Sequence, residues 1–194
     1  IRHPRPPDGK RLMARLPYLD EDDLAEEDKD IVKRPINLNR IIAHSPEAAH
    51  KFSGVGGYIR FGSSLDPRLR EMAILQVGYL TKSPYEYSHH LKIGRDFGVA
   101  ESDVTAIETE TAGGDSGLPE LDRAVLRGAR EMTEGMKLSD DTYAVWAEHL
   151  SEAHIVDLTM VIAFYNGVVR LLGALEIDVE PEYAPELEKH PLPE

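Results

Sequence analysis

Three helix-start signals recur along the first half of the chain and constrain its fold most strongly. They are Ser45-Pro46, Asp66-Pro67 and Ser83-Pro84. A serine or aspartate that caps free backbone N–H groups, followed by proline at the first helical position, is typical of a helix N-terminus. Almost no segment alternates apolar and polar residues with the period of two that a half-buried strand needs. The chain is therefore predicted to be all-α, with about seven or eight helices.

One helical domain is expected between two extended ends. Residues 1–18 are rich in proline and basic residues, and residues 182–194 are rich in proline, so both are predicted to be extended arms. The domain between them spans 19–181. The helix predicted over 67–82 is apolar over most of its surface, and 151–175 is the longest apolar stretch, so both are expected to be central.

The helix predicted to start at Pro46 contains three glycines close together, Gly54, Gly56 and Gly57. Glycine in a helix interior costs stability relative to alanine. Three of them at this spacing therefore indicate a close helix contact or a bend in this helix.

The composition excludes several classes of partner and chemistry. The formal net charge is −13, so the surface would repel nucleic acid and anionic membranes. No apolar run approaches the 18 or so residues of a transmembrane helix. The chain has no cysteine, which excludes disulfides, thiolate nucleophiles and zinc–thiolate sites. With no targeting signal recognised, a cytoplasmic location is expected.

The segment SPYEYSHH, residues 83–90, allows two interpretations. Ser83 and Glu86 have the spacing of a capping box, in which each side chain bonds the other's backbone N–H at a helix start. Glu86 and His90 are also four residues apart, so they share one helix face. A carboxylate beside an imidazole sets its pKa and its tautomer, as a general acid or base requires.

Other polar residues can join this pair. Glu71 lies on the preceding, mostly apolar helix, and if it is buried near His90 its pKa is expected to rise, so that it relays protons. Tyr85 supplies a hydroxyl at the same helix start, where free N–H groups favour anions. Tyr165 is a polar group within an apolar helix, so it either makes a buried hydrogen bond or lines a cavity.

A carboxylate-bridged di-iron centre is a competing interpretation. Two E-x-x-H motifs and two further glutamates form such sites in four-helix bundles. The corresponding residues here are Glu47 with His50, Glu86 with His89, and the separate glutamates Glu71 and Glu148. Both motifs begin in the first turn after a proline, at the rim of a bundle rather than its middle, so no metal is expected.

The stretch LDPRLREMAILQVGYLTKSPYEYSHHLKIGRDFGVAESDVTAI, residues 65–107, resembles the core of the carboxymuconolactone decarboxylase family, which includes the AhpD-like alkylhydroperoxidases. The second half resembles the partner region of longer members, so the resemblance covers most of 35–181. It implies an AhpD-like all-α fold whose protomers form dimers, often trimers of dimers. A homo-oligomer is therefore expected.

The two branches of this family differ at the motif. In the peroxidase branch, a glutamate on the preceding helix and a histidine correspond to Glu71 and His90. The two cysteines of that branch correspond to Ser83 and Glu86, so thiol peroxidase chemistry is excluded here. The decarboxylase branch has E-x-x-x-H, which Glu86 and His90 match. That branch acts on small carboxylated lactones without metal or organic cofactor.

These observations predict a cofactor-free, lyase-type acid/base enzyme for a small carboxylated lactone or related organic acid. His90 is expected to be the general acid or base, Glu86 to orient it, and Glu71 to relay protons. The residues expected to contact substrate are Tyr85, His89, Ser83, Arg70 and Tyr165. Arg68 or Arg70 is expected to hold a substrate carboxylate through a bidentate pair. The alternatives are a non-catalytic homo-oligomer that lacks the redox cysteines, and the di-iron protein.

Overall fold

The computed structural model describes residues 14–193, and these are all-helical, as the sequence predicted. Residues 1–13 of the predicted N-terminal arm lie outside the described residues. The α-helices of the described part are α1 (Asn37–Ile42), α2 (Pro46–Gly57), α3 (Pro67–Leu80), α4 (Pro84–Asp96), α5 (Glu101–Thr111), α6 (Glu120–Gly135), α7 (Asp140–His149), α8 (Glu152–Leu175) and α9 (Ala184–Lys189). The three cap-and-proline signals mark the starts of α2, α3 and α4.

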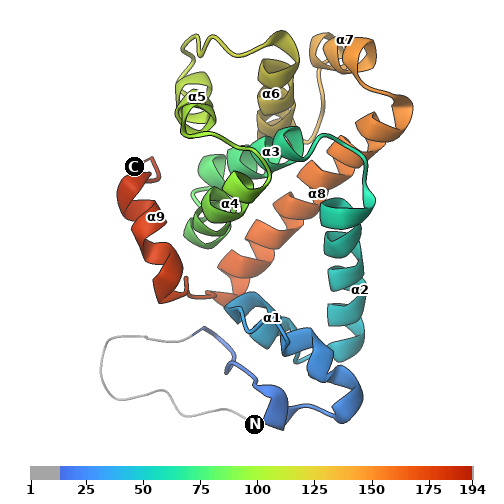
Figure 1. The fold of residues 1–194 in the computed structure, drawn as a ribbon, viewed down its shortest axis with the longest axis vertical. Helices are drawn as coiled ribbons and strands as arrows, with labels where there is room; N and C mark the ends of the chain where they lie inside the picture. The colour runs from blue at the N-terminus through green and yellow to red at the C-terminus, as the bar shows by residue number, and fades with distance from the viewer. Residues whose placement is uncertain (1–13, 194) are drawn as a thin grey trace.

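Two apolar helices form the centre of the molecule, α3 and α8 (Figure 1). Residues 69–78 of α3 are all buried, and α3 packs against α4, α5, α6 and α8. Among the described helices, α8 alone is long and apolar enough to cross a membrane, but it packs into this core through residues such as Leu158, Ile162 and Val169. The central position expected for both helices is therefore confirmed.

The glycine-rich end of α2 changes helix type. Residues Tyr58–Gly62 form a π-helical turn, η3, directly after Gly57. Widened turns of this kind are frequent at functional sites. Helix α2 lies on the side of α8 away from α9 (Figure 1), and α1 closes the end of the molecule between α2 and the C-terminal end of α8.

The C-terminal segment is helical, whereas its prolines predicted an extended arm. A 3₁₀ turn, η4 (Pro181–Tyr183), is followed by α9, and α9 packs against α4. Pro181 and Pro185 both lie in the first turn of their helices, where proline removes no intrahelical hydrogen bond. Proline-rich composition therefore did not exclude helices here.

Candidate active site

His90 lies between two carboxylates in the interior of the protein. It projects from α4 and only 3% of it is exposed. Its Nδ1 is 2.6 Å from Oε2 of Glu71, and its Nε2 is 3.0 Å from Oε1 of Glu86. Burial alone would lower the pKa of His90, but the two carboxylates raise it to about 9. At neutral pH both ring nitrogens therefore carry protons, and His90 is an imidazolium.

Glu71 is the buried end of this arrangement. It is 1% exposed on α3, and Nε of Arg70 donates to its Oε1 at 3.0 Å. Burial would raise the pKa of Glu71, but the charges of His90 and Arg70 hold it below its usual range. The expectation of a raised pKa was therefore wrong, because two cations rather than one face this carboxylate.

Arg70 supports this site from behind and does not line a cavity. Its Nη1 donates to the carbonyl of Arg60 at 3.1 Å in the π-helical turn. Its guanidinium also lies 4.4 Å from the ring centroid of Phe97. These contacts and Glu71 occupy Arg70, which is 2% exposed. The structure therefore places Arg70, a predicted substrate contact, where it fixes Glu71 and the turn after α2.

Close packing of α3 and α4 brings Glu71 to His90. A Cβ atom at Gly78 of α3 would lie 3.1 Å from the backbone nitrogen of Tyr87 in α4, so the glycine permits this approach. The capping box predicted for Ser83 and Glu86 does not form, because the Ser83 side chain makes no cap hydrogen bond. Glu86 instead contacts His90 one turn further along α4. The contact between Glu86 and His90 that their spacing predicted is therefore present.

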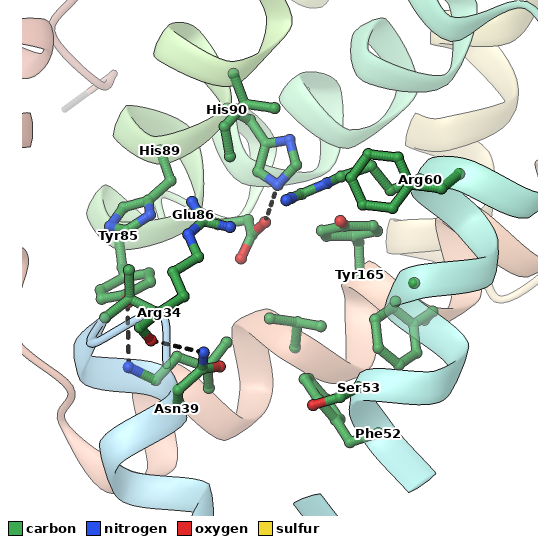
Figure 2. Close-up of a pocket in the computed structure, with 18 residues that line it drawn as sticks. Arg34, Asn39, Phe52, Ser53, Arg60, Tyr85, Glu86, His89, His90 and Tyr165 are labelled. Atoms are coloured by element: carbon green, nitrogen blue, oxygen red, sulfur yellow. Dashed lines mark hydrogen bonds and ion pairs between the residues drawn. The ribbon is translucent and has the colours of Figure 1, made fainter. Parts of the chain in front are cut away.

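A cavity of about 190 Å³ opens in front of Glu86 and His90 (Figure 2). Its walls come from α1, α2, α4, α8 and the π-helical turn. Gly56 and Gly57 form a part of the wall that carries no side chains. Phe52 and Phe164 make other parts of the wall apolar. In Figure 2, one oxygen of Glu86 faces His90 and the other faces the open space. Glu86 is therefore the carboxylate that this arrangement presents to a ligand.

Tyr165 lies beside His90 in the wall of the cavity. The two rings pack edge to face, with centroids 5.0 Å apart. Burial and the nearby Glu86 and Glu71 raise the pKa of Tyr165, so its hydroxyl stays protonated. Of the predicted substrate contacts, Tyr165 is thus placed at the cavity with a hydroxyl available as a hydrogen-bond donor.

Tyr85 and His89 also line the cavity, but their polar atoms are engaged by the C-terminal segment. Nε2 of His89 is 2.7 Å from Oε2 of Glu180, and the Tyr85 hydroxyl donates to Oε1 of Glu180 at 2.9 Å. The His89 ring is stacked between Tyr85 and Tyr183, with centroids 4.1 Å and 3.6 Å away. These residues attach the segment after α8 to α4. Ser83 is buried and is not part of the cavity wall.

The residues nominated for a di-iron centre are not brought together. His50 lies 3.2 Å from Asp28, and His89 bonds Glu180. Glu71 and Glu86 both face His90. Within residues 14–193, no group of three or more histidine, aspartate or glutamate side chains has an arrangement that could hold a metal ion.

Two arginines at the cavity, Arg34 and Arg60, were not predicted from the sequence. Arg34 lies between the η2 turn (Glu26–Val32) and α1, and Arg60 lies in the π-helical turn. Neither position carries a motif, so only the fold brings them to the site. Arg68, the other predicted carboxylate-binding residue, makes ion pairs of 2.6 Å with Asp103 and 2.7 Å with Asp122 instead.

Comparison with known proteins finds one family model that matches part of the chain and several structures with a similar fold. Residues 46–130 match the model of the carboxymuconolactone decarboxylase family. No curated protein matches the chain. Among solved structures, an alkylhydroperoxidase AhpD core protein from Ralstonia eutropha JMP134, described as an uncharacterized peroxidase-related protein, has a TM-score of 0.76 at 16% identity, covering 90% of this chain and 96% of its own.

Two further structures are similar over nearly their whole length. An uncharacterized peroxidase-related protein from Silicibacter sp. TM1040 has a TM-score of 0.72 at 19% identity, covering 92% of this chain and 97% of its own. The debrominase Bmp8, solved in complex with 2,3,4-tribromopyrrole, has a TM-score of 0.75 at 18% identity, covering 93% and 98%. At these identities the likenesses show that the AhpD-like fold extends over most of the chain.

Proposed function

We propose, on the premise that residues 46–130 belong to the carboxymuconolactone decarboxylase family, that this cysteine-free protein is a cofactor-free acid/base enzyme of the lyase type. Its substrate is a small carboxylated lactone or a related single-ring organic acid. The observation that carries the proposal is the buried chain Glu71–His90–Glu86, which ends in a carboxylate oxygen at a cavity.

The geometry supports other roles for these residues than those predicted from the sequence. His90 has no free ring nitrogen, because Glu71 and Glu86 face one each, so it does not act directly as the base. Glu86 accepts a proton from a substrate carbon, or returns one, through the oxygen that faces the cavity. The imidazolium of His90 stabilises the charge of Glu86, and Glu71 balances that imidazolium. Proton transfer by a positioned group contributes about 10² to 10⁴ in rate.

The size and surface of the cavity support a single-ring substrate. An apolar cavity of about 150 Å³ binds benzene, and the cavity here is about 190 Å³. One ring with one or two small substituents fits that volume. Phe52, Phe164 and Ile93 provide apolar wall for the ring, and Tyr165 and Glu86 provide polar groups. Bmp8, which has the same fold, was solved with a small ring compound, a tribromopyrrole.

The proposal is tested by proton exchange, which needs no knowledge of the net reaction. Carboxylated five-membered lactones and single-ring organic acids are incubated with the protein in D₂O, and loss of their C–H signals is followed by ¹H NMR. For any compound that exchanges or turns over, Glu86→Gln is expected to lower the rate at least about 10²-fold. Glu148→Gln, at an exposed glutamate on α7, is the matched control. An unchanged rate in Glu86→Gln contradicts the assignment.

Exposed apolar side chains support assembly into a homo-oligomer, which we also propose. Phe61 is 77% exposed in the π-helical turn, and Tyr58, Val156 and Met160 are exposed as well. The Tyr58 hydroxyl donates to Asp157 at 2.9 Å, so the turn and the start of α8 are adjacent. Exposed apolar side chains on adjacent elements favour a protein interface. Light scattering is expected to show that the wild type is a dimer or a larger oligomer and that Phe61→Glu is a monomer. A monomeric wild type contradicts this proposal.

A further inference from the structure

Most of the described arginines are paired with carboxylates, as a chain of net charge −13 favours. In residues 14–193, Arg34, Arg60 and Arg170 are the arginines with no ion pair to an aspartate or glutamate. The other arginines of this part make such pairs, at residues 15, 40, 68, 70, 95, 123, 127 and 130. Two of the three exceptions, Arg34 and Arg60, line the cavity in front of Glu86.

The two arginines approach the cavity from opposite sides. Figure 2 shows the guanidinium of Arg34 and that of Arg60 directed toward the space around Glu86. Their backbones are fixed, because the carbonyl of Arg34 accepts from Asn39 Nδ2 at 2.9 Å and the carbonyl of Arg60 accepts from Arg70. The main chains of Arg34 and Arg60 are therefore held in place. Neither guanidinium is neutralised by an ion pair with a neighbouring aspartate or glutamate of the described part.

The charges that line the cavity do not balance. Arg34 and Arg60 line it together with one carboxylate, Glu86, and the charge of the His90 imidazolium is balanced by Glu71 behind it. This leaves an excess of one positive charge in the cavity wall of a protein whose net charge is strongly negative. A cleft of one sign with low-dielectric walls concentrates ligands of the opposite sign. The excess would be neutralised by a ligand that carries negative charge.

We propose that Arg34 and Arg60 bind the carboxylate of a single-ring anionic substrate at the mouth of this cavity. The planar guanidinium fork matches a carboxylate bidentately, which a point charge does not. The ring then lies against Phe52 and Phe164, and one of its carbons faces Glu86. This inference rests on the proposed function, because it takes the Glu86 cavity as the substrate site, and it adds which residues select an anion.

Benzoate and benzamide are suitable probes because they have nearly the same shape and differ in charge. Titration calorimetry is expected to show that the wild type binds benzoate at least about tenfold more tightly than benzamide, since charge-assisted hydrogen bonds exceed neutral ones. Arg34→Gln and Arg60→Gln are each expected to weaken benzoate about tenfold and to leave benzamide unchanged. Arg60→Lys keeps the charge without the fork and is expected to recover part of the affinity.

Arg170→Gln is the matched control, because Arg170 also lacks a carboxylate partner but lies exposed on α8 outside the cavity wall. It is expected to bind benzoate like the wild type. Melting temperatures of all variants show whether a loss of binding reflects unfolding. Equal affinity for benzoate and benzamide, undetectable binding of benzoate, or unchanged benzoate affinity in both cavity variants overturns the proposal.

Failure of this inference can be distinguished from failure of the proposed function. Glu86→Gln is expected to lose exchange or turnover yet still bind benzoate, because both arginines remain. If Glu86→Gln loses exchange while the arginine variants bind benzoate normally, only the anion site is wrong. If the arginine variants lose benzoate while Glu86→Gln exchanges normally, the anion site holds and the acid/base assignment fails.

Discussion

The charge state of His90 predicts how the stability of this protein depends on pH. The pKa of His90 is raised from its ordinary 6.5 to about 9 in the folded protein. A raised folded-state pKa adds stability that is complete below pH 6.5 and is lost as the pH rises through 9. Each pKa unit corresponds to 1.36 kcal/mol, so this contribution is about 3 kcal/mol, most of which is lost by pH 10.

His90→Gln removes this contribution and leaves two buried carboxylates with fewer partners. Glu71 keeps Arg70, but Glu86 loses its ion-pair partner. Breaking a buried pair from one side costs about 3 to 5 kcal/mol, which is less than the stability of most domains. The variant is therefore expected to fold and to be less stable than the wild type by about that amount at pH 7.

Urea unfolding at pH 7 and pH 10 gives the free energy of unfolding of the wild type and of His90→Gln. The two pH values show how much stability the variant has lost and how much of that loss depends on pH. The stability difference is expected to narrow by about 2 to 3 kcal/mol at pH 10, because His90 of the wild type has then lost its charge. His149→Gln, at an exposed histidine of α7, controls for the removal of a surface histidine. A difference that stays constant from pH 7 to pH 10 would refute the reasoning, since His90 would then not lose a proton in that range.

Three further substitutions test the surrounding structure. His89→Ala removes the contact with Glu180, so amide hydrogen exchange in residues 181–193 is expected to speed up about tenfold or more while α3 stays protected. Gly57→Leu places a side chain in the cavity wall, and a Cβ there meets no atom within 4 Å, so benzoate affinity is expected to fall while the melting temperature is unchanged. The control Gly54→Leu lies outside the cavity wall and is expected to leave both benzoate affinity and melting temperature unchanged. Arg68→Gln is expected to cost about 1 to 2 kcal/mol in urea unfolding, with unchanged benzoate affinity, because its two carboxylate partners lie away from the cavity.

Local spacing predicted the parts of the site that one helix determines. Glu86 and His90 are four residues apart on α4, so helix geometry alone places them in contact. The starts of α2, α3 and α4 follow from the local position of a proline in the first turn, and α3 is also capped by the Asp66 side chain. The contact between His90 and Glu71 crosses two helices, and it was predicted through the family resemblance rather than through spacing.

The remaining features depend on packing that spacing does not reveal. The sequence does not show that Arg70 folds inward onto Glu71, and this second cation reverses the direction of the Glu71 pKa shift. Arg34 and Arg60 lie 26 residues apart in segments without a motif, and only the tertiary fold brings them to one cavity. Ser83 and Glu86 fit a capping box by spacing, but Glu86 contacts His90 instead, because a buried imidazolium attracts the carboxylate more strongly than a backbone N–H.

The protonation state of His90 is the direct test of the buried chain that ends at the cavity. Nitrogen-15 NMR of histidine-labelled protein, with His90→Gln used to assign the signal, reports whether each ring nitrogen carries a proton. The structure predicts that both nitrogens of His90 are protonated at pH 7 and that the ring becomes neutral only near pH 9. A neutral His90 ring at pH 7 would contradict the account, because Glu86 would then face the cavity without a charged partner behind it.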